Sequence, residues 1–157
     1  MKRARGFTLM ELLVTVAILA ILAGMAVPTV ELAARRSKEQ ELRTELRRIR
    51  EALDAYKRAV DDGRLAAAAN ESGYPKSLQA LVDGVENVKD PKKGKLYFLR
   101  RVPRDPFAGE KVADAADTWG LRSYASAADD PQPGEDVFDV YSRARGTGIN
   151  GVPYRAW

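Results

Sequence analysis

Apolar and polar positions divide the chain into three stretches. From Phe7 to Val30 nearly every residue is apolar, and no residue between Leu12 and Val30 carries a charge. About 20 apolar residues at a rise of about 1.5 Å cover roughly 30 Å, the thickness of the hydrocarbon core of a bilayer. A polar, helix-like pattern follows to Val60, and mixed short patterns follow that. We therefore predict a membrane-spanning helix over 7–30 that continues as an amphipathic helix over 31–60.

The stretch 31–60 contains no Gly or Pro and is rich in good helix formers. Its apolar positions, spaced alternately by four and three residues, are Leu42, Leu46, Ile49, Leu53, Tyr56 and Val60. This is one face of a helix, and so short a stripe is more typical of a domain-packing face than of a coiled-coil seam or a membrane-surface helix. Residues 35–41 are polar all round, and we expect them to face water or neighbouring subunits.

Pro28 lies inside the helical pattern, and its ring opposes the carbonyl of Gly24. A kink or local melting between these two residues is the expected consequence. A simple bend at the membrane exit would need no function.

Residues 61–157 form the predicted head. Asp61-Asp62-Gly63 is expected to end the long helix, and a short helix is predicted within the segment 72–82, with Pro75 at its first helical position. Two prolines bar a regular central strand from the segment 100–107.

Two runs in the head alternate between apolar and polar residues, at 121–126 and at 137–142. The turn-rich residues 129–136 lie between them, which predicts an antiparallel hairpin with a long loop. The resulting sheet must pack on the apolar stripe of the helix to bury enough surface. We predict an α+β fold in which a long N-terminal helix packs against a small antiparallel sheet.

The composition excludes several kinds of chemistry. The chain has no Cys and no His, which rules out thiol nucleophiles, Ser-His-Asp triads and Cys- or His-ligated metals. Its formal net charge is +4, but Lys2, Arg3 and Arg5 lie ahead of the first element, so the charge argues only weakly for nucleic acid. We expect no catalytic residues, no cofactor and no nucleic-acid partner.

Two groups of residues are candidates for binding. The acidic residues that could supply oxygen ligands to calcium are Asp129, Asp130, Glu135, Asp136 and Asp139. The spacing of an EF-hand is absent, so a solvated acidic turn is favoured and no metal site is predicted. The aromatic residues that could stack on bases or sugars are Trp119, Tyr124, Phe138, Tyr141 and Trp157. Aromatic residues on strands usually belong to the core.

The N-terminus has three interpretations: a secretory signal peptide, a plain signal anchor, and a leader that ends at Gly6. The basic residues ahead of the apolar run orient the N-terminus toward the cytoplasm. The run is longer than that of a signal peptide, and a plain anchor does not account for Glu11. An acid costs about 2.5–3.5 kcal/mol at the centre of a membrane helix and less near its end, so Glu11 is a candidate functional residue.

The contiguous residues Gly6-Phe7-Thr8-Leu9-Met10-Glu11-Leu12-Leu13-Val14 resemble the prepilin signature of type IV pilins and type II secretion pseudopilins. The resemblance implies that a prepilin peptidase cuts after Gly6 and methylates the new amine of Phe7. It also implies that Glu11 meets the Phe7 amine of a neighbouring subunit and sets the filament register. Pairing within one chain (residues 7 and 11 are i and i+4) and a snorkelling carboxylate are the alternatives.

The head extends this resemblance to the major pseudopilin of type II secretion. The matching segments are Tyr74-Pro75, 78–82, 102–107, 138–142 and the final Trp157. Two departures stand out: 109–119 looks like an insertion, and 143–150 lacks the acids with which major pseudopilins hold calcium.

The resemblance implies a pseudopilin that polymerises into a periplasmic filament for type II protein secretion. Its partners would be other copies of itself, other pseudopilins, the inner-membrane assembly platform and the prepilin peptidase. The chain would cross the bacterial inner membrane once, with a cytoplasmic N-terminus and a periplasmic head. The alternatives are a type IV pilin serving adhesion, motility or DNA uptake, and a membrane-anchored enzyme or binding module.

Overall fold

The computed structural model describes residues 7–68, 70–109 and 111–157, without the side chains of 24–29. The chain divides into two compact units, Met1–Ser37 and Lys38–Trp157. Helix α1, Leu9–Asp61, contributes its first part to the first unit and its remainder to the second. Each unit is described by itself below.

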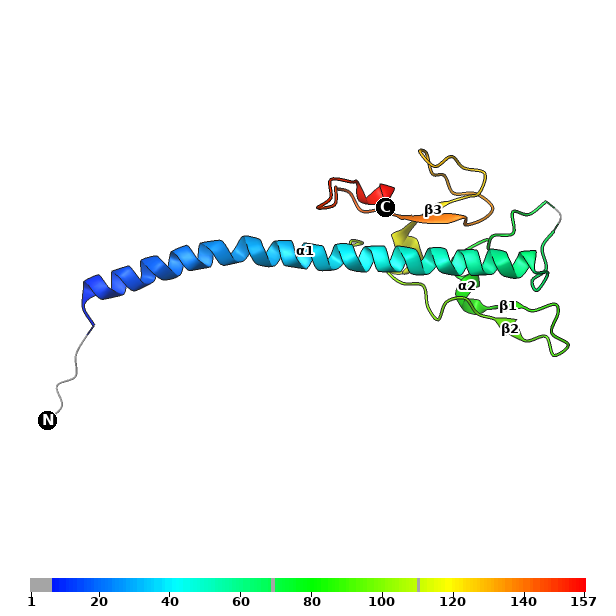
Figure 1. Cartoon of the computed structure of the whole chain (residues 1–157), viewed down its shortest axis with the longest axis horizontal. Coiled ribbons are helices and arrows are strands. Elements are labelled where there is room, and N and C mark those ends of the chain that lie inside the picture. Colours follow the sequence, from blue (N-terminus) through cyan, green and yellow to red (C-terminus); the bar gives the residue numbers. More distant parts are fainter. Residues whose placement is uncertain (1–6, 69, 110) are drawn as a thin grey trace. The chain divides into compact units, whose positions relative to one another are not determined.

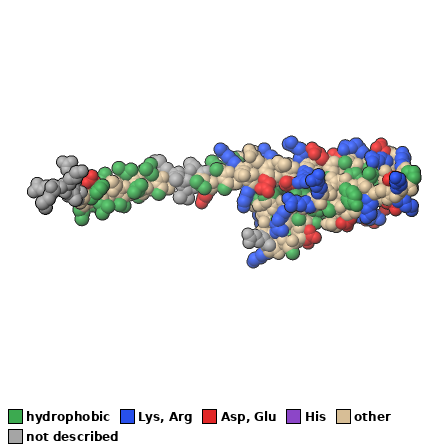
Figure 2. All heavy atoms as spheres, turned by 90° about the horizontal axis from the view of Figure 1, so that it is seen from below, with side chains coloured by type: hydrophobic (Ala, Val, Ile, Leu, Met, Phe, Trp, Pro, Cys, Tyr) green, Lys and Arg blue, Asp and Glu red, His purple; other side chains and the backbone are tan. Residues whose placement is uncertain are grey.

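The first unit is helical from Leu9 onward and carries large exposed hydrophobic side chains. Figure 2 shows hydrophobic side chains over much of its described surface. Among the helices that the structure describes, none is both long and apolar enough to cross a membrane. The span predicted over 7–30 includes 24–29, whose side chains lie outside the described residues, and it stays a prediction.

The backbone of α1 is helical through Gly24 and Pro28, so local melting is not observed there. The predicted kink is a separate matter and stays untested. The side chain of Pro28 itself lies outside the described residues.

The second unit packs its head on the predicted stripe of α1. Leu42, Leu46, Ile49 and Leu53 are each at most 2% exposed, and Tyr56 packs against the same core. From the head, the core receives among others Leu81, Trp119 and Val140. Figure 1 shows α2, β1 and β2 on one side of this part of α1, with β3 and the C-terminus on the other. The predicted α+β fold is confirmed.

The long helix ends as predicted, at Asp61, and Gly63 follows with a φ of 67°, which favours glycine. The short helix predicted over 72–82 is mostly wrong. Helix α2 spans only Ala80–Asp83, so Pro75 is not its first residue. The carbonyl of Pro75 instead accepts a hydrogen bond of 2.8 Å from the backbone N–H of Val137, which holds this segment against the sheet region.

Four short strands form two antiparallel ribbons. Strands β1, Val85–Glu86, and β2, Lys95–Leu96, pair as a small hairpin that the sequence did not indicate. Strands β3, Trp119–Arg122, and β4, Asp139–Ser142, pair with Trp119 opposite Ser142 and Arg122 opposite Asp139. Both strands of the predicted hairpin thus exist, with different bounds: β3 begins two residues earlier than predicted and ends four residues earlier, whereas β4 begins two residues later and ends at Ser142 as predicted. The segment 100–107 contains no strand, as predicted.

Two short 3₁₀ helices lie in the described part of the head. The 3₁₀ helices η1, Ala116–Thr118, and η2, Tyr154–Ala156, flank β3 and the C-terminus. Trp119 is buried as expected, but Tyr124 is 61% exposed, so it is not a core residue. Glu39, within the stretch expected to face water, is only 6% exposed. Its exposure is low because it lies three residues before Leu42 on the same face of α1.

Candidate processing and assembly site

The first turn of α1 is built by a cap. Thr8 directly precedes the helix, and its Oγ1 accepts a hydrogen bond of 3.2 Å from the backbone N–H of Glu11. This satisfies one of the four N–H groups that a helix start leaves without a partner. The pattern Thr-x-x-Glu is that of a capping box, in which the acid occupies the third helical position. Thr8 was missed as a structural residue, although this spacing in the sequence would have identified it.

The structure describes two of the four predicted site residues in full. Phe7 is 76% exposed, and Glu11 is exposed in the first turn of α1. Gly6 lies outside the described residues, as does the side chain of Pro28. The roles of all four residues in processing and assembly therefore remain predictions.

Electrostatics favours an acid at position 11. The N-terminal end of a helix carries a partial positive charge, which stabilises an anionic side chain in the first turn by about 0.3–1 kcal/mol. No basic side chain of the described residues forms an ion pair with Glu11.

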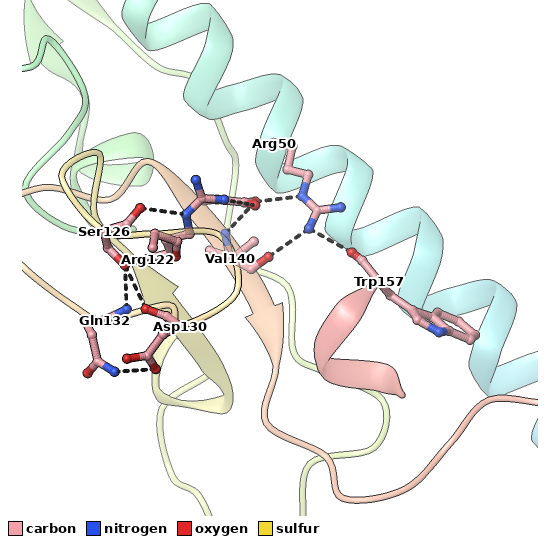
Figure 3. Close-up of polar contacts among 9 residues, drawn as sticks. Arg50, Arg122, Ser126, Asp130, Gln132, Val140 and Trp157 are labelled. Carbon is pink, nitrogen blue, oxygen red and sulfur yellow. Dashed lines mark hydrogen bonds and ion pairs between the residues drawn. The ribbon is translucent and has the colours of Figure 1, made fainter. Parts of the chain in front are cut away.

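In the head, Arg50 ties α1 to the second ribbon and to the C-terminus (Figure 3). Its Nε donates to Asp139 Oδ1 at 2.7 Å, and its Nη2 donates to the carbonyls of Val140 and Trp157 at 3.1 and 2.9 Å. Arg122 lies on the other side of the same carboxylate, with its Nη1 3.9 Å from Asp139 Oδ2. One guanidinium therefore links helix α1 to strand β4 and to the C-terminal residue.

Two buried carboxylates were not identified from the sequence. Asp105 is 1% exposed and accepts hydrogen bonds from Ser142 Oγ at 2.5 Å and from the backbone N–H of Phe107 at 2.8 Å. Glu39 Oε1 accepts from the hydroxyl of Tyr154 at 2.8 Å and from the backbone N–H of Ile149 at 2.9 Å. Both acids are satisfied by protein donors, which makes them structural anchors of the C-terminal segments.

The acids weighed for calcium also have protein donors or face solvent. Asp136 Oδ1 accepts from the backbone N–H of Tyr124, Asp130 Oδ1 accepts from Gln132 Nε2, and Asp139 is held by Arg50. Asp129 and Glu135 are exposed. Within the described parts of the chain, no three acidic side chains gather as a metal site would require. Calcium independence remains a prediction for solution measurement.

One exposed ion pair perturbs its partners. The pKa of Glu71 is lowered, first by a hydrogen bond from the backbone N–H of Ala68 and then by Lys76. The pKa of Lys76 is raised by its hydrogen bond to Glu71. The two charged atoms lie 3.1 Å apart at the surface of the head, where an ion pair contributes little to stability.

Comparison with known proteins decides the family. Residues 1–27 match the prokaryotic N-terminal methylation motif. The chain is 32% identical to the type II secretion system core protein G of Pseudomonas aeruginosa, over 86% of this chain and 91% of that protein. The chain belongs to the family of type II secretion system core protein G.

Other members of the core protein G family agree with this assignment. The protein of Klebsiella pneumoniae is 33% identical over 70% of this chain and 74% of its own length. That of Klebsiella michiganensis is 29% identical over 84% of this chain and 88% of its own. No solved structure matches the chain significantly. The predicted resemblance to pseudopilins of type II secretion is confirmed.

Proposed function

We propose that this chain is a pseudopilin that polymerises into a periplasmic filament and thereby supports type II protein secretion. The observation that carries the proposal is the similarity to core protein G along most of the chain, headed by the methylation motif over residues 1–27. The α+β head packed on the amphipathic part of α1 agrees with such a subunit. The role is structural, and the proposal assigns no catalytic residue and no cofactor.

In this proposal the N-terminus is processed before assembly. A prepilin peptidase cuts between Gly6 and Phe7 and methylates the new amine of Phe7. The apolar residues 7–30 remain on the mature protein and anchor it in the bacterial inner membrane, with the N-terminus cytoplasmic and the head periplasmic. The exposed hydrophobic side chains of the first unit support this, because they require cover from lipid or from other subunits.

Assembly in this proposal depends on Glu11. The methylated amine of Phe7 carries a positive charge, and Glu11 of a neighbouring subunit neutralises it in the apolar filament core. Other pseudopilins and an inner-membrane assembly platform are the further partners. Pro28 lets the helix bend where it leaves the membrane or the filament core.

The experiment that tests the function deletes the gene and scores three phenotypes side by side: secretion of exported proteins, surface pili and twitching motility. A pseudopilin predicts that secretion fails while pili and twitching continue, and that the intact gene restores secretion. Loss of pili with normal secretion would identify the alternative, a type IV pilin. Retention of all three would contradict both filament assignments.

A further inference from the structure

The ribbon of β3 and β4 carries opposite charges at its two ends. Residues 127–136, here called the acidic loop, lie in the connection between the strands and include four acids and no basic residue. Arg143 and Arg145 follow β4 at the other end of the ribbon, and Arg155 lies beside them in η2. The acidic loop and these three arginines therefore lie at opposite ends of the ribbon, and Asp117 lies beside Arg143 at the arginine end.

The three arginines line a shallow groove of about 510 Å³, here called the arginine groove. Arg143 Nη1 donates to the carbonyl of Asp117 at 3.2 Å, and the guanidinium of Arg155 lies over the ring of Tyr141 at 5.2 Å. All three arginine side chains are exposed. None of the described residues that line the groove is acidic, and no described carboxylate forms an ion pair with any of the three arginines. Guanidinium groups bind carboxylates through paired hydrogen bonds, so a groove lined by three arginines can bind acidic side chains.

The acidic loop presents its carboxylates on an ordered backbone. Gln132 accepts a backbone hydrogen bond of 3.0 Å from Ser123 and donates one of 2.8 Å to Ser126 Oγ. The hydroxyl of Ser126 also lies 3.2 Å from the carbonyl of Asp130, to which it donates (Figure 3). Asp129, Asp130 and Glu135 are exposed on this framework. A loop already ordered loses little conformational entropy when it docks.

The two surfaces of one copy lie at opposite ends of the ribbon of β3 and β4. Four residue pairs, from Trp119 opposite Ser142 to Arg122 opposite Asp139, separate the acidic loop from the arginines. At about 3.3 Å per residue this separation is on the order of 10 Å before either loop begins. The charges of one copy therefore remain available to a second copy.

We propose that the acidic loop of one copy docks in the arginine groove of the next copy. The contact joins two different surfaces, and such a head-to-tail contact repeats as an open filament unless its rotation closes a ring. This inference rests on the proposed function, and it names the part of the head that sets the order of subunits.

Charge reversal in the full chain, expressed in its native cells in place of the chromosomal copy, tests the proposal. One variant reverses the loop (Asp129→Arg with Asp130→Arg), one reverses the groove (Arg143→Glu with Arg145→Glu), and one carries all four changes. The matched control is Arg100→Glu with Arg101→Glu, which makes the same charge change at two exposed arginines outside the groove. The readout is the fraction of the protein that sediments as filaments.

We expect each reversal alone to lower the filament fraction about tenfold, because like charges then meet at every contact. In the fourfold variant, or when the two reversed chains are expressed together, the filament fraction should recover to within about threefold of the wild-type value. The control variant should have the filament fraction of the wild type. The chain has no native Cys, so Ala128→Cys with Ala144→Cys should give a ladder of disulfide-linked multimers on oxidation.

Wild-type filaments together with unaffected single reversals would overturn the inference and leave the proposed function standing. Single reversals that fail without mutual rescue, and without a disulfide ladder, would overturn it as well. Absence of wild-type filaments would instead contradict the proposed function itself.

Discussion

At Glu11 one carboxylate sits in two structural contexts. Glu11 stands at the third helical position, where its backbone N–H donates to Thr8 Oγ1, and its carboxylate carries the negative charge that the family resemblance assigns to pairing with a neighbouring amine. These contexts separate chemically, because glutamine serves at the third position of a capping box and carries no charge. The single substitution Glu11→Gln therefore keeps the cap and removes the charge needed for the ion pair.

Processing at Gly6 and Phe7 gives the first prediction at the residue scale. We expect the membrane-extracted protein to begin at methylated Phe7, because the methylation motif directs cleavage ahead of the apolar run. Intact-mass spectrometry measures this directly. Removal of the prepilin peptidase should leave the chain starting at Met1, and a mature start near Val27 would show that signal peptidase acts instead.

The ion pair of Glu71 and Lys76 gives a pH-dependent prediction. The folded-state pKa of Glu71 lies below its ordinary value of 4.5, so its contribution to stability is present above that value and is lost as pH falls through the folded pKa. We expect Glu71→Gln to lower the melting temperature of the fragment 31–157 at pH 7. The difference from the wild type should vanish in strong acid, and a difference that persists there would contradict the assigned cause.

Among the elements, the turn after α2 requires a glycine. Gly84 has a φ of 74° and a ψ of 147°, and a Cβ built there would lie 2.6 Å from Tyr97 Cε1. Tyr97 is 66% exposed and its ring can move aside, but the backbone conformation remains strained for any other residue. The conformational requirement therefore decides the effect of substitution.

We expect Gly84→Ala to lower the unfolding free energy of the fragment 31–157 by about 1–3 kcal/mol. The matched control is Gly109→Ala, because a Cβ at Gly109 meets no atom within 4 Å and its φ lies outside the left-handed region. The control should stay within about 0.5 kcal/mol of the wild type. Urea denaturation followed by circular dichroism compares the two, and equal effects would contradict the assignment to backbone strain.

The long elements follow from local signals in the sequence, and the short ones depend on tertiary contacts. The alternating spacing from Leu42 to Leu53 predicts the buried face of α1, and Asp61-Asp62-Gly63 predicts its end. Strands β1 and β2 have two residues each, too few for any pattern to emerge. Helix α2 is shorter than predicted because its segment is held by the sheet region through Pro75.

Some residues of the candidate site can be identified from the sequence, and others only from the fold. The contiguous run from Gly6 to Val14 identifies the processing region without any structure, and Thr8 follows from its spacing to Glu11. The buried acids Glu39 and Asp105 require the fold, because their partners Tyr154 and Ser142 lie far along the chain. Sequence patterns report neighbours in the chain, and long-range hydrogen bonds leave no such pattern.

The molecule as a whole has described groups that association with other copies would cover or neutralise. The first unit exposes large hydrophobic side chains, and the described residues provide no partner for the Glu11 carboxylate. Association of copies would remove this apolar area from water and would let the Glu11 carboxylate pair with the amine of a neighbouring copy. The central claim is therefore polymerisation through Glu11 and the processed N-terminus.

The most direct measurement compares filament formation and secretion in cells that carry Glu11→Gln, Glu11→Asp or the matched control Glu31→Gln, another acid of α1. Removing one partner of a buried ion pair costs about 3–5 kcal/mol, so Glu11→Gln should lower assembly by orders of magnitude although it keeps the capping box. Leader cleavage should continue, Glu11→Asp should assemble partly, and Glu31→Gln should assemble normally. Normal filaments and normal secretion from Glu11→Gln would contradict the account.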